Sequence, residues 1–535
     1  MAADQQRRGT LHGMTFDVII VGGGAAGCVI AARLSEDPDC RVALIEAGSA
    51  SRSPLLTIPG LGAFAARGAW HMWRHPSEPE TGLDGRPPVL LQGRVLGGGS
   101  SVNGMVYTRG HAYDYDAWAE PGWRFADVLP FFRRAETNER GASDWHGGDG
   151  PLRVRRSMPA SPLPARFLEA AASAGFAILD DLNTNAVDAF GLTDVTIDGG
   201  RRSSTRAAYL EPALHRPNLT VLTGRSVLRI RCEGGRAIGV EVTGQGGVVL
   251  LRAEREIILT AGGLKTPHLL LLSGIGPAAQ LAACGIPVQV DAPEVGRNLQ
   301  NHPSFPLRYR GGAPDSLARY VTPLGALRAA VDYATARRGI LAEGLFAAAG
   351  FFRTDPALLA PDAQVVMSPA LMPAGDARGL GLLPREHGVT LAVQQGTPFS
   401  RGDVTLRSAD PLAPPRIRTG AFSDPRDIAI LSRAIAVTRE IMSQSAMRGL
   451  VPERGAPASP EAEIRALSGT AYHYCGTCRM GSDATAVVDA ALRVRGIQGL
   501  RVADASIIPR IPNAALHAPT VMIAERAAAL ISAMD

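Results

Sequence analysis

Lysine is almost missing from this 535-residue chain, because Lys265 is the only one and arginine carries nearly all of the positive charge. The arginines are scattered in runs of at most two, and the formal net charge is +5 at pH 7. Because nucleic-acid recognition needs clustered positive charge, we expect no nucleic-acid partner. The preference for arginine instead fits the codon usage of a GC-rich bacterial gene.

Long apolar runs are also missing, since no stretch reaches the ~18 uninterrupted apolar residues that a membrane-spanning helix needs. The first residues, MAADQQRRGTLHGM, are polar and lack the apolar core of a signal peptide, so we expect a loose tail before the first strand. Cysteine is scarce, and six dispersed thiols are too few for the disulfide framework of a secreted domain. We therefore expect a cytoplasmic protein with no integral membrane segment.

The length of the chain predicts more than one domain, because 535 residues exceed what a single hydrophobic core usually organises. The composition, with 46% hydrophobic and 20% charged residues, is close to that of an ordinary globular protein. No internal repeat or low-complexity tract interrupts it.

The segment FDVIIVGGGAAGCVIAARLSEDPDCRVALIEAG contains the first motif that points to a ligand. An apolar run over 16–21 predicts a buried parallel strand, and a helix of small residues follows to about Ser35. A second strand is predicted from Arg41 to Glu46. This order of elements predicts a βαβ unit.

The glycines of this unit have the spacing of a dinucleotide-binding turn. Gly22 permits the tight turn, Gly24 lets the backbone approach a pyrophosphate, and Gly27 lets the helix pack closely on the strand. The helix N-terminus adds free N–H groups and the positive end of its dipole. Glu46 stands where a carboxylate can accept hydrogen bonds from both ribose hydroxyls, and its charge disfavours a 2′-phosphate.

Two later segments identify the family that the sequence resembles. The first covers 92–118 and reads QGRVLGGGSSVNGMVYTRGHAYDYDAW. Its run of glycines and serines is too flexible for a core element, unless a large ligand packs against it. IILTAGGLKTPHLLLLSGIGP, over 257–277, predicts a strand, a glycine turn and a leucine-rich helix. With the βαβ unit, these segments resemble the glucose-methanol-choline (GMC) oxidoreductases, a family of FAD-dependent alcohol oxidases and dehydrogenases. The resemblance continues through VGRNLQNHP (295–303), PFSRGDVTLRSADP (398–411) and LRVADASIIP (500–509).

The resemblance implies an α/β and α+β fold of two discontinuous domains. A Rossmann-like FAD-binding domain would comprise 14–155, 202–311 and 460–535, and an antiparallel-sheet substrate domain would comprise 156–201 and 312–459. The apolar stretch GILAEGLFAAAGFF, over 339–352, either lines the substrate pocket or is an ordinary buried helix and loop. Besides the βαβ residues, the resemblance implies cofactor contacts at Gly98, Asn103, Val106, Val227, Asp504 and Ala505.

The loop YHYCGTCRMG, over 472–481, carries the expected catalytic base. In the family this loop bears the active-site histidine, and His473 stands at that position. Oxidation of an alcohol removes a hydroxyl proton and a hydride, and an imidazole suits the proton. The CxxC of Cys475 and Cys478 has no second ligand pair beside it, so we interpret these thiols as packing residues and expect no metal site.

The sequence departs from the family at the second catalytic position. After ADASIIP the family carries an Asn or His that hydrogen-bonds the substrate oxygen, but Ala515 stands there. His517, two residues later, or Asn513 could take this role, and we favour His517; alternatively His473 works alone. Val102 stands where family members with covalent flavin have a histidine, so we expect non-covalent FAD.

These residues favour oxidation of a primary or secondary alcohol to an aldehyde or ketone, with oxygen or another electron acceptor. One alternative is a lyase resembling the family members that cleave hydroxynitriles. Another is a light-driven fatty-acid decarboxylase, but the strand VTLAVQQG (389–396) lacks the cysteine which that branch uses. A flavin-binding module without catalysis is disfavoured, because storage does not need the histidine loop. The sequence does not specify the alcohol, the acceptor or the oligomeric state.

Overall fold

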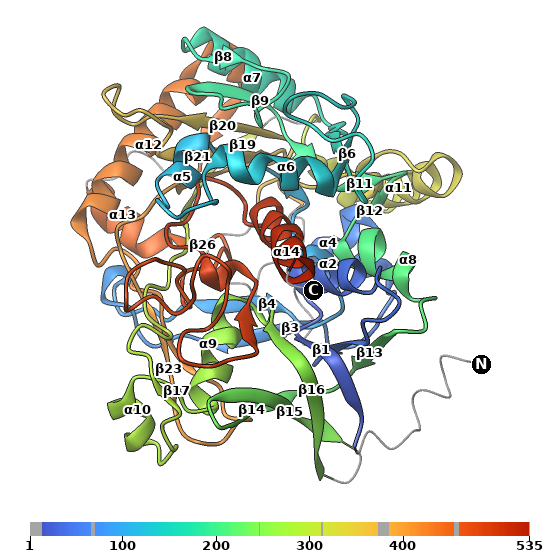
Figure 1. Ribbon diagram of the computed structural model, residues 1–535. Helices are drawn as coiled ribbons and strands as arrows, with labels where there is room; N and C mark the ends of the chain where they lie inside the picture. Colours follow the sequence, from blue (N-terminus) through green and yellow to red (C-terminus); the bar gives the residue numbers. More distant parts are fainter. Residues whose placement is uncertain are drawn as a thin grey trace.

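A computed structural model describes residues 13–65, 70–244, 247–311, 314–372, 385–453 and 459–533 (Figure 1). Residues 1–12, most of the expected N-terminal tail, lie outside these ranges. Within them, none of the helices combines the length and the apolar character that crossing a membrane requires.

The described residues form a seven-stranded mixed sheet that contains the predicted βαβ unit. Strand β1 (Thr15–Val21), helix α2 (Ala25–Leu34) and strand β2 (Val42–Glu46) follow one another, so the predicted unit is confirmed. Strands β13, β2, β1, β16 and β27 are parallel, and β15 and β14 extend the sheet antiparallel. The remaining strands are β13 (Leu219–Thr223), β14 (Val227–Glu233), β15 (Arg236–Gly244), β16 (Gly247–Leu259) and β27 (Leu500–Val502).

Helices cover this sheet on the side that faces the rest of the molecule. The last helix, α14 (His517–Ser532), packs against α2 and against α6 (Phe125–Ala135), near the middle of the molecule in Figure 1. The predicted strand, turn and helix over 257–277 are confirmed as the end of β16 followed by α9 (Gly262–Leu272). The N-terminus of α14 is buried, since His517 and Ala518 have little exposed surface.

A second sheet has eight strands in the described residues and lies at the opposite end of the molecule (Figure 1). Its order is β25, β19, β22, β21, β20, β9 and β8, with β26 also paired to β19. All pairs are antiparallel except β8 with β9. Helices α7 (Leu163–Ser173) and α12 (Pro425–Ser443) back it. The strands are β8 (Ala177–Ile178), β9 (Ala189–Leu192), β19 (Pro303–Gly311), β20 (Ala348–Phe352), β21 (Ala363–Ser368), β22 (Gly388–Gln395), β25 (Leu450–Pro452) and β26 (Gly469–Thr470).

This sheet bears on the predicted domain boundaries. Strand β19 lies within 202–311, which was assigned to the FAD-binding domain, yet it pairs with β22 of the second sheet. Strand β26, within 460–535, pairs with β19 in the same sheet. The domain boundaries stay a prediction. The chain enters the second sheet with β19, several residues before 311.

Shorter elements complete the described fold. The helices are α3 (Pro54–Thr57), α4 (Gly62–Ala65), α5 (Ala112–Asp116), α8 (Glu211–Ala213), α10 (Ala278–Ala283), α11 (Pro323–Ala336) and α13 (Pro460–Leu467). The strands are β3 (Met72–Pro76), β4 (Val89–Gly93), β5 (Val106–Tyr107), β6 (Glu136–Asn138), β7 (Leu152–Arg156), β10 (Asp194–Val195), β11 (Ile197–Asp198), β12 (Arg201–Arg202), β17 (Ile275–Gly276), β18 (Val290–Asp291), β23 (Asp403–Thr405) and β24 (Arg416–Arg418).

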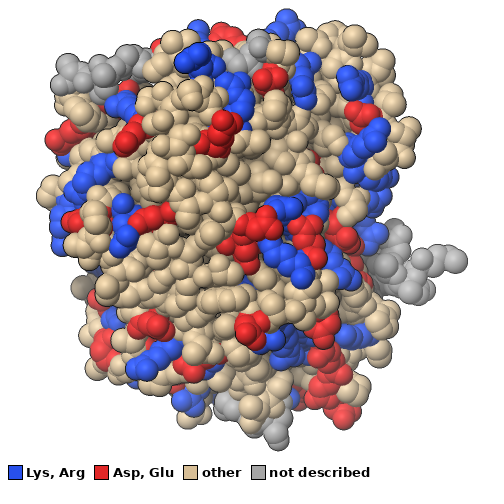
Figure 2. Space-filling model, turned by 90° about the horizontal axis from the view of Figure 1, so that it is seen from above, with Lys and Arg blue, Asp and Glu red and all other residues tan. Residues whose placement is uncertain are grey.

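Surface charge is mixed on the face drawn in Figure 2, where acidic and basic side chains lie beside one another. Many arginines pair with nearby carboxylates, as Arg41 does with Asp17 and Arg418 with Asp403. Such exposed pairs contribute little to stability. On that face they divide the positive charge into small areas, in line with the scattered charge of the sequence.

A buried ionic network joins Glu136, the first residue of β6, to loop residues Arg109, His146 and Asp181. Arg109 Nη2 donates to Glu136 Oε1 at 2.6 Å, and His146 contacts Glu136 Oε1 through Nδ1 and Asp181 Oδ2 through Nε2, both at 2.7 Å. Burial alone would lower the pKa of His146, but the hydrogen bonds to Asp181 and Glu136 raise that pKa to about 9. A protonated His146 therefore stabilises the fold.

This raised pKa predicts a pH-dependent stability. In the unfolded chain the pKa is near 6.5, so the contribution of His146 is fully present below that pH and is lost as the pH rises through about 9. His146→Gln should lower the Tm by about 2–4 °C at pH 6.5, and the difference from wild type should shrink toward zero by pH 10. Calorimetry of the two proteins across this range measures it.

The exposed His215 offers a matched control. His215→Gln should leave the Tm unchanged at every pH in the series. A Tm difference for His146→Gln that stays constant from pH 6.5 to 10 would show that the His146 proton contributes nothing.

Candidate active site

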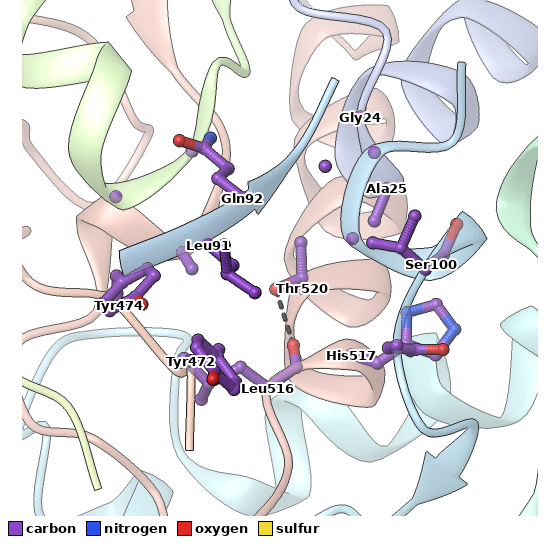
Figure 3. A pocket seen from close by; sticks show the side chains of 18 of the residues that line it. Gly24, Ala25, Leu91, Gln92, Ser100, Tyr472, Tyr474, Leu516, His517 and Thr520 are labelled. Atoms are coloured by element: carbon purple, nitrogen blue, oxygen red, sulfur yellow. Dashed lines mark hydrogen bonds between the residues drawn. The ribbon is translucent and has the colours of Figure 1, made fainter. Parts of the chain in front are cut away.

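A cavity of about 770 Å³ lies between the two sheets. Its walls come from the carboxyl ends of β1 and β2, the loop after β4, the N-termini of α9 and α14, and one face of the second sheet. Its volume is in the range of cofactor and ligand pockets. Figure 3 shows Gly24, Ala25, Ser100 and His517 on one side of this space and Leu91, Tyr472 and Tyr474 on the other.

Two glycine loops meet at one wall of the cavity. Gly22 has φ +107°, and an added Cβ would lie 2.6 Å from the carbonyl oxygen of Thr260. An added Cβ on Gly98 would lie 2.7 Å from the Cα of Gly24, so the two loops touch through bare backbone. Behind them Gly27 does not line the cavity, and a Cβ there would collide with the Gly22 carbonyl oxygen. This backbone cradle has the form that a pyrophosphate needs.

Glu46 lies beside the cradle at the end of β2. Its two carboxylate oxygens accept hydrogen bonds from Gly23 N at 2.9 Å and from Gly48 N at 2.6 Å. Burial raises the pKa of Glu46, while these two hydrogen bonds oppose the rise. Each carboxylate oxygen keeps a second lone pair, so Glu46 can still accept from a ribose hydroxyl.

The loop after β4 is held by a buried arginine. Arg202 donates through Nη1 to the Asn103 side chain at 2.7 Å and to the Asn103 and Ser100 carbonyl oxygens. Its Nε donates to the Leu56 carbonyl oxygen at 3.0 Å. Burial lowers the pKa of Arg202 to about 10. A fixed loop over 98–103 gives the cavity a rigid wall.

The other residues that sequence analysis assigned to the cofactor also reach this cavity. Asp504 accepts from Gly262 N and from Thr266 Oγ1, which ties the loop after β27 to the start of α9. The predicted cofactor residues that line the cavity are Gly22, Gly24, Glu46, Gly98, Asn103, Val106, Val227, Asp504 and Ala505, and Val102 lines it too. Their cofactor contacts stay a prediction, and the cradle and carboxylate fit an adenine dinucleotide.

His473 lines the cavity and is hydrogen-bonded to a second histidine. The Nδ1 atoms of His473 and His302 are 2.8 Å apart, and the two rings are nearly perpendicular. His302 Nε2 is 2.8 Å from the carbonyl oxygen of Gly396, directly after β22. The backbone N–H of His473 donates to Asn301 Oδ1 at 2.8 Å.

These contacts fix the tautomers of both rings. A carbonyl oxygen only accepts, so His302 must carry its proton on Nε2. In a neutral His302, Nδ1 is then an acceptor, and His473 must carry its proton on Nδ1. His473 Nε2 is left with a free lone pair.

Burial keeps both rings neutral. It lowers the pKa of His473 well below its usual range, and His302 lowers it further. Burial also lowers the pKa of His302 to about 4, although its hydrogen bonds to backbone carbonyls oppose this. The free lone pair of His473 therefore remains available as a base at neutral pH.

The loop at the second catalytic position contains Ala515, at the family's position, and the two candidates for the partner role, Asn513 and His517. Ala515 lines the cavity and donates its backbone N–H to Thr108 Oγ1 at 2.9 Å. Asn513 does not line the cavity, because its side chain donates to the Pro361 carbonyl oxygen at 3.1 Å. Asn513 is therefore not placed to hydrogen-bond a substrate oxygen beside His473.

His517 is buried against the cavity at the start of α14. Neither of its ring nitrogens has a hydrogen-bond partner within the described residues. Burial lowers the pKa of His517 to about 4, with a smaller effect of Arg202. In Figure 3 its ring lies on the side of Ser100, across from Tyr472. Its proposed partnership with His473 stays a prediction.

The two cysteines of the CxxC pack in the core, as the packing interpretation predicts. Cys475 and Cys478 are free thiols with no exposed surface, and burial raises the pKa of both. In the ranges that the structure describes, no three His, Cys, Asp or Glu side chains are grouped as a metal site would need.

Two residues of the site carried no role in the sequence analysis. His302 lies in the quoted motif VGRNLQNHP, and a histidine in a family motif was a usable signal. Lys265, the single lysine, lines the cavity 5.0 Å from the Trp73 ring centroid, and burial lowers its pKa to about 8. Nothing in the local sequence showed that this lysine is buried.

Comparisons with known proteins agree with this geometry. Residues 16–304 match the N-terminal model of the GMC oxidoreductases, and 398–524 match the C-terminal model. An oxygen-dependent choline dehydrogenase of Rhizobium johnstonii is 41% identical over 527 residues, covering 96% of this chain and 95% of the relative. Pyridoxine 4-oxidase from Mesorbium loti is 32% identical with a TM-score of 0.85, covering 96% and 98% of the two chains. A formate oxidase of Aspergillus oryzae, solved in work on its FAD modification, is 27% identical with a TM-score of 0.89, covering 98% and 99%.

The hydrogen bond between the two histidines predicts a positioning role for His302. His302→Leu removes the acceptor for the His473 Nδ1 proton and should slow reduction of bound flavin by substrate ~10-fold or more. His302→Asn keeps an oxygen near the position of Nδ1 and should recover most of that rate. Rapid-mixing measurement of flavin bleaching compares the variants.

The FAD content of each variant separates positioning from folding. Both variants should bind FAD as wild type does. Equal rates for the leucine and asparagine variants would contradict the role of the hydrogen bond.

Proposed function

Because the chain belongs to the GMC oxidoreductase family, we propose that it is an FAD-dependent enzyme that oxidises a primary or secondary alcohol to a carbonyl compound. The observation that carries this proposal is the free lone pair of His473 Nε2 in the cavity that also holds the glycine cradle. A base and a dinucleotide site in one cavity are what alcohol oxidation requires.

The chain's own residues handle the substrate proton. His302 would accept the Nδ1 proton of His473, which leaves Nε2 as the acceptor for the hydroxyl proton. Burial of His473 makes its protonated form costly, so the proton must move onward once the alkoxide has reacted.

FAD, when bound, supplies the acceptor for the hydride of the carbinol carbon. The cradle at Gly22, Gly24 and Gly98 would hold its pyrophosphate, and Glu46 would hold the ribose. Val102, which lines the cavity, offers no nucleophile for a covalent bond to the flavin. We therefore propose non-covalent FAD.

The two alternative reactions have less support. In the strand β22 (Gly388–Gln395), where a decarboxylase cysteine is expected, no cysteine occurs. None of the six cysteines lines the described cavity. A lyase would need no hydride acceptor, whereas the relatives reported above are dehydrogenases and oxidases by name.

Location and electron acceptor are further parts of the proposal. We propose a cytoplasmic protein, supported by six free cysteines in a fold large enough for disulfides. Oxygen or another oxidant would reoxidise the flavin. Anaerobic mixing with varied alcohols in the dark, followed by oxygen, tests the reaction and the acceptor together; a flavin that bleaches only in light would overturn the proposal.

The mode of FAD binding can be tested on the purified protein. The protein should be yellow, and acid or heat should release intact FAD into the supernatant. Chromatography of the supernatant and the pellet measures the partition. Flavin that stays with the precipitated chain would contradict non-covalent binding, and bound NADP would contradict the cofactor.

The two histidines can be ranked by their variants. His473→Ala should keep FAD bound and slow flavin reduction by ~100-fold or more, the usual scale of general-base catalysis. His517→Ala should slow it ~10-fold if His517 hydrogen-bonds the substrate oxygen, and Ala515→Asn in that background should restore part of the rate. Rapid mixing measures all three variants.

Each outcome has a distinct meaning. A His473→Ala variant that is reduced at the wild-type rate removes His473 from the mechanism. A His517→Ala variant that behaves like wild type, beside an inactive His473→Ala, leaves His473 as the single base.

A further inference from the structure

The charge of the cavity bears on which alcohol the enzyme takes. Its described lining has four positive side chains and two negative ones, Glu46 and Asp504. Both carboxylates accept backbone N–H groups in the cofactor half, Glu46 from Gly23 and Asp504 from Gly262. The two phosphates of bound FAD would bring the total charge to zero. The positive residues are Arg94, Arg202, Arg225 and Lys265.

No carboxylate is therefore left to pair with a cationic substrate within the described lining. Burying an unpaired ammonium is unfavourable, and a cation–π contact with an aromatic ring offsets only part of that cost. Five aromatic residues line the cavity: Trp73 already contacts Arg94 and Lys265, and the rings of Phe346, Phe351, Tyr472 and Tyr474 carry no formal counter-charge. A quaternary ammonium alcohol such as choline is thus poorly matched to the cavity.

The wall opposite the cofactor half is one face of the second sheet. Register pairs Ser304 with Gln394, Gln394 with Gln364, and Gln364 with Phe351, which places these side chains in one row. The next row on the same face holds Ala392, Val366 and Ala349. Residues of both rows line the cavity.

The first row, which is mainly polar, lies closest to the histidine pair. His302 is two residues before Ser304 on β19, and Gly396 is two residues after Gln394 on β22. Two residues along a strand span about 7 Å. A substrate whose hydroxyl meets His473 would therefore pass the glutamine row first and then the apolar row.

Gln364 has an unused hydrogen-bond donor in this row. Its side chain is 3% exposed, and its Nε2 has no partner in the described part of the chain. A buried amide donor without a partner has a free-energy cost. Gln364 lines the cavity, so a turn of its amide would let a ligand atom accept from Nε2 and remove that cost.

We propose that the enzyme selects an uncharged alcohol with an apolar body, and that Gln364 is a specificity residue which donates to a hydrogen-bond acceptor on that body. The acceptor is a ring nitrogen, carbonyl or ether oxygen placed beyond the carbinol carbon. Phe346, Phe351 and Val366 enclose the remaining apolar part. This inference rests on the alcohol oxidation proposed above.

A matched substrate pair tests the charge. Choline and 3,3-dimethylbutan-1-ol have the same shape and differ only by the exchange of a quaternary nitrogen for carbon. The holoenzyme should oxidise 3,3-dimethylbutan-1-ol with a kcat/KM at least ~10-fold above that for choline. A kcat/KM that is equal or higher for choline would overturn the inference.

A second pair tests Gln364. One of the pyridylmethanol isomers should exceed benzyl alcohol in kcat/KM by ~10-fold, because its ring nitrogen accepts from Gln364 Nε2. In Gln364→Leu, the kcat/KM for this isomer should fall close to that for benzyl alcohol. In Gln364→Glu, the kcat/KM for choline should rise relative to that for 3,3-dimethylbutan-1-ol. Unchanged ratios in both variants would overturn the role of Gln364.

Gln395 supplies the control. It is buried next to the same row but donates to Asp427 Oδ1 at 2.8 Å and does not line the cavity. Gln395→Leu should leave both substrate ratios as in wild type. If no alcohol bleaches the flavin, the proposed function itself fails; if choline is the best substrate, only this inference fails.

Discussion

The hydrogen bond between His302 and His473 is the interaction on which the site depends. Burial lowers the pKa of both rings, so neither is held as an imidazolium and the proton positions follow from the acceptors. The last acceptor is a backbone carbonyl, that of Gly396, which cannot change its protonation. The Gly396 carbonyl, directly after a strand of the second sheet, thus sets the tautomer of His302 and, through it, that of His473.

The histidine pair and the cofactor cradle come from different sheets. His302 directly precedes β19, Gly396 directly follows β22, and His473 lies in the loop after β26. The glycine cradle and Glu46 come instead from the ends of β1 and β2 in the first sheet. The cavity is lined by residues of both groups, so cofactor and substrate would meet between the two sheets.

The sequence predicted the local parts of this arrangement well. The βαβ unit occupies consecutive residues, and its two strands and the end of its helix agree with the structure to within one residue. The family resemblance indicated His473, and the structure places it in the cavity. The stretch 339–352, for which two interpretations were open, includes β20 and supplies Phe346 and Phe351 to the wall.

The parts that were missed depend on distant pairings. His302 and His473 are 171 residues apart in the chain, and no local pattern shows that their rings meet. The row of Ser304, Gln394, Gln364 and Phe351 requires the register of four strands, and a shift of one residue would turn Gln364 toward the opposite face. The boundary at 311 was placed by motif and stays a prediction, whereas the pairing of β19 with β22 of the second sheet shows only in the structure.

The central claim is that the carbinol carbon gives up a hydride while His473 takes the hydroxyl proton. The most direct test is the rate of anaerobic flavin reduction in the dark by an accepted alcohol and by the same alcohol deuterated at its carbinol carbon. The account predicts bleaching with both, and slower bleaching with the deuterated alcohol. The account would be contradicted if the flavin did not bleach in the dark. It would also be contradicted if both alcohols bleached the flavin at the same rate in a single turnover that binding does not limit.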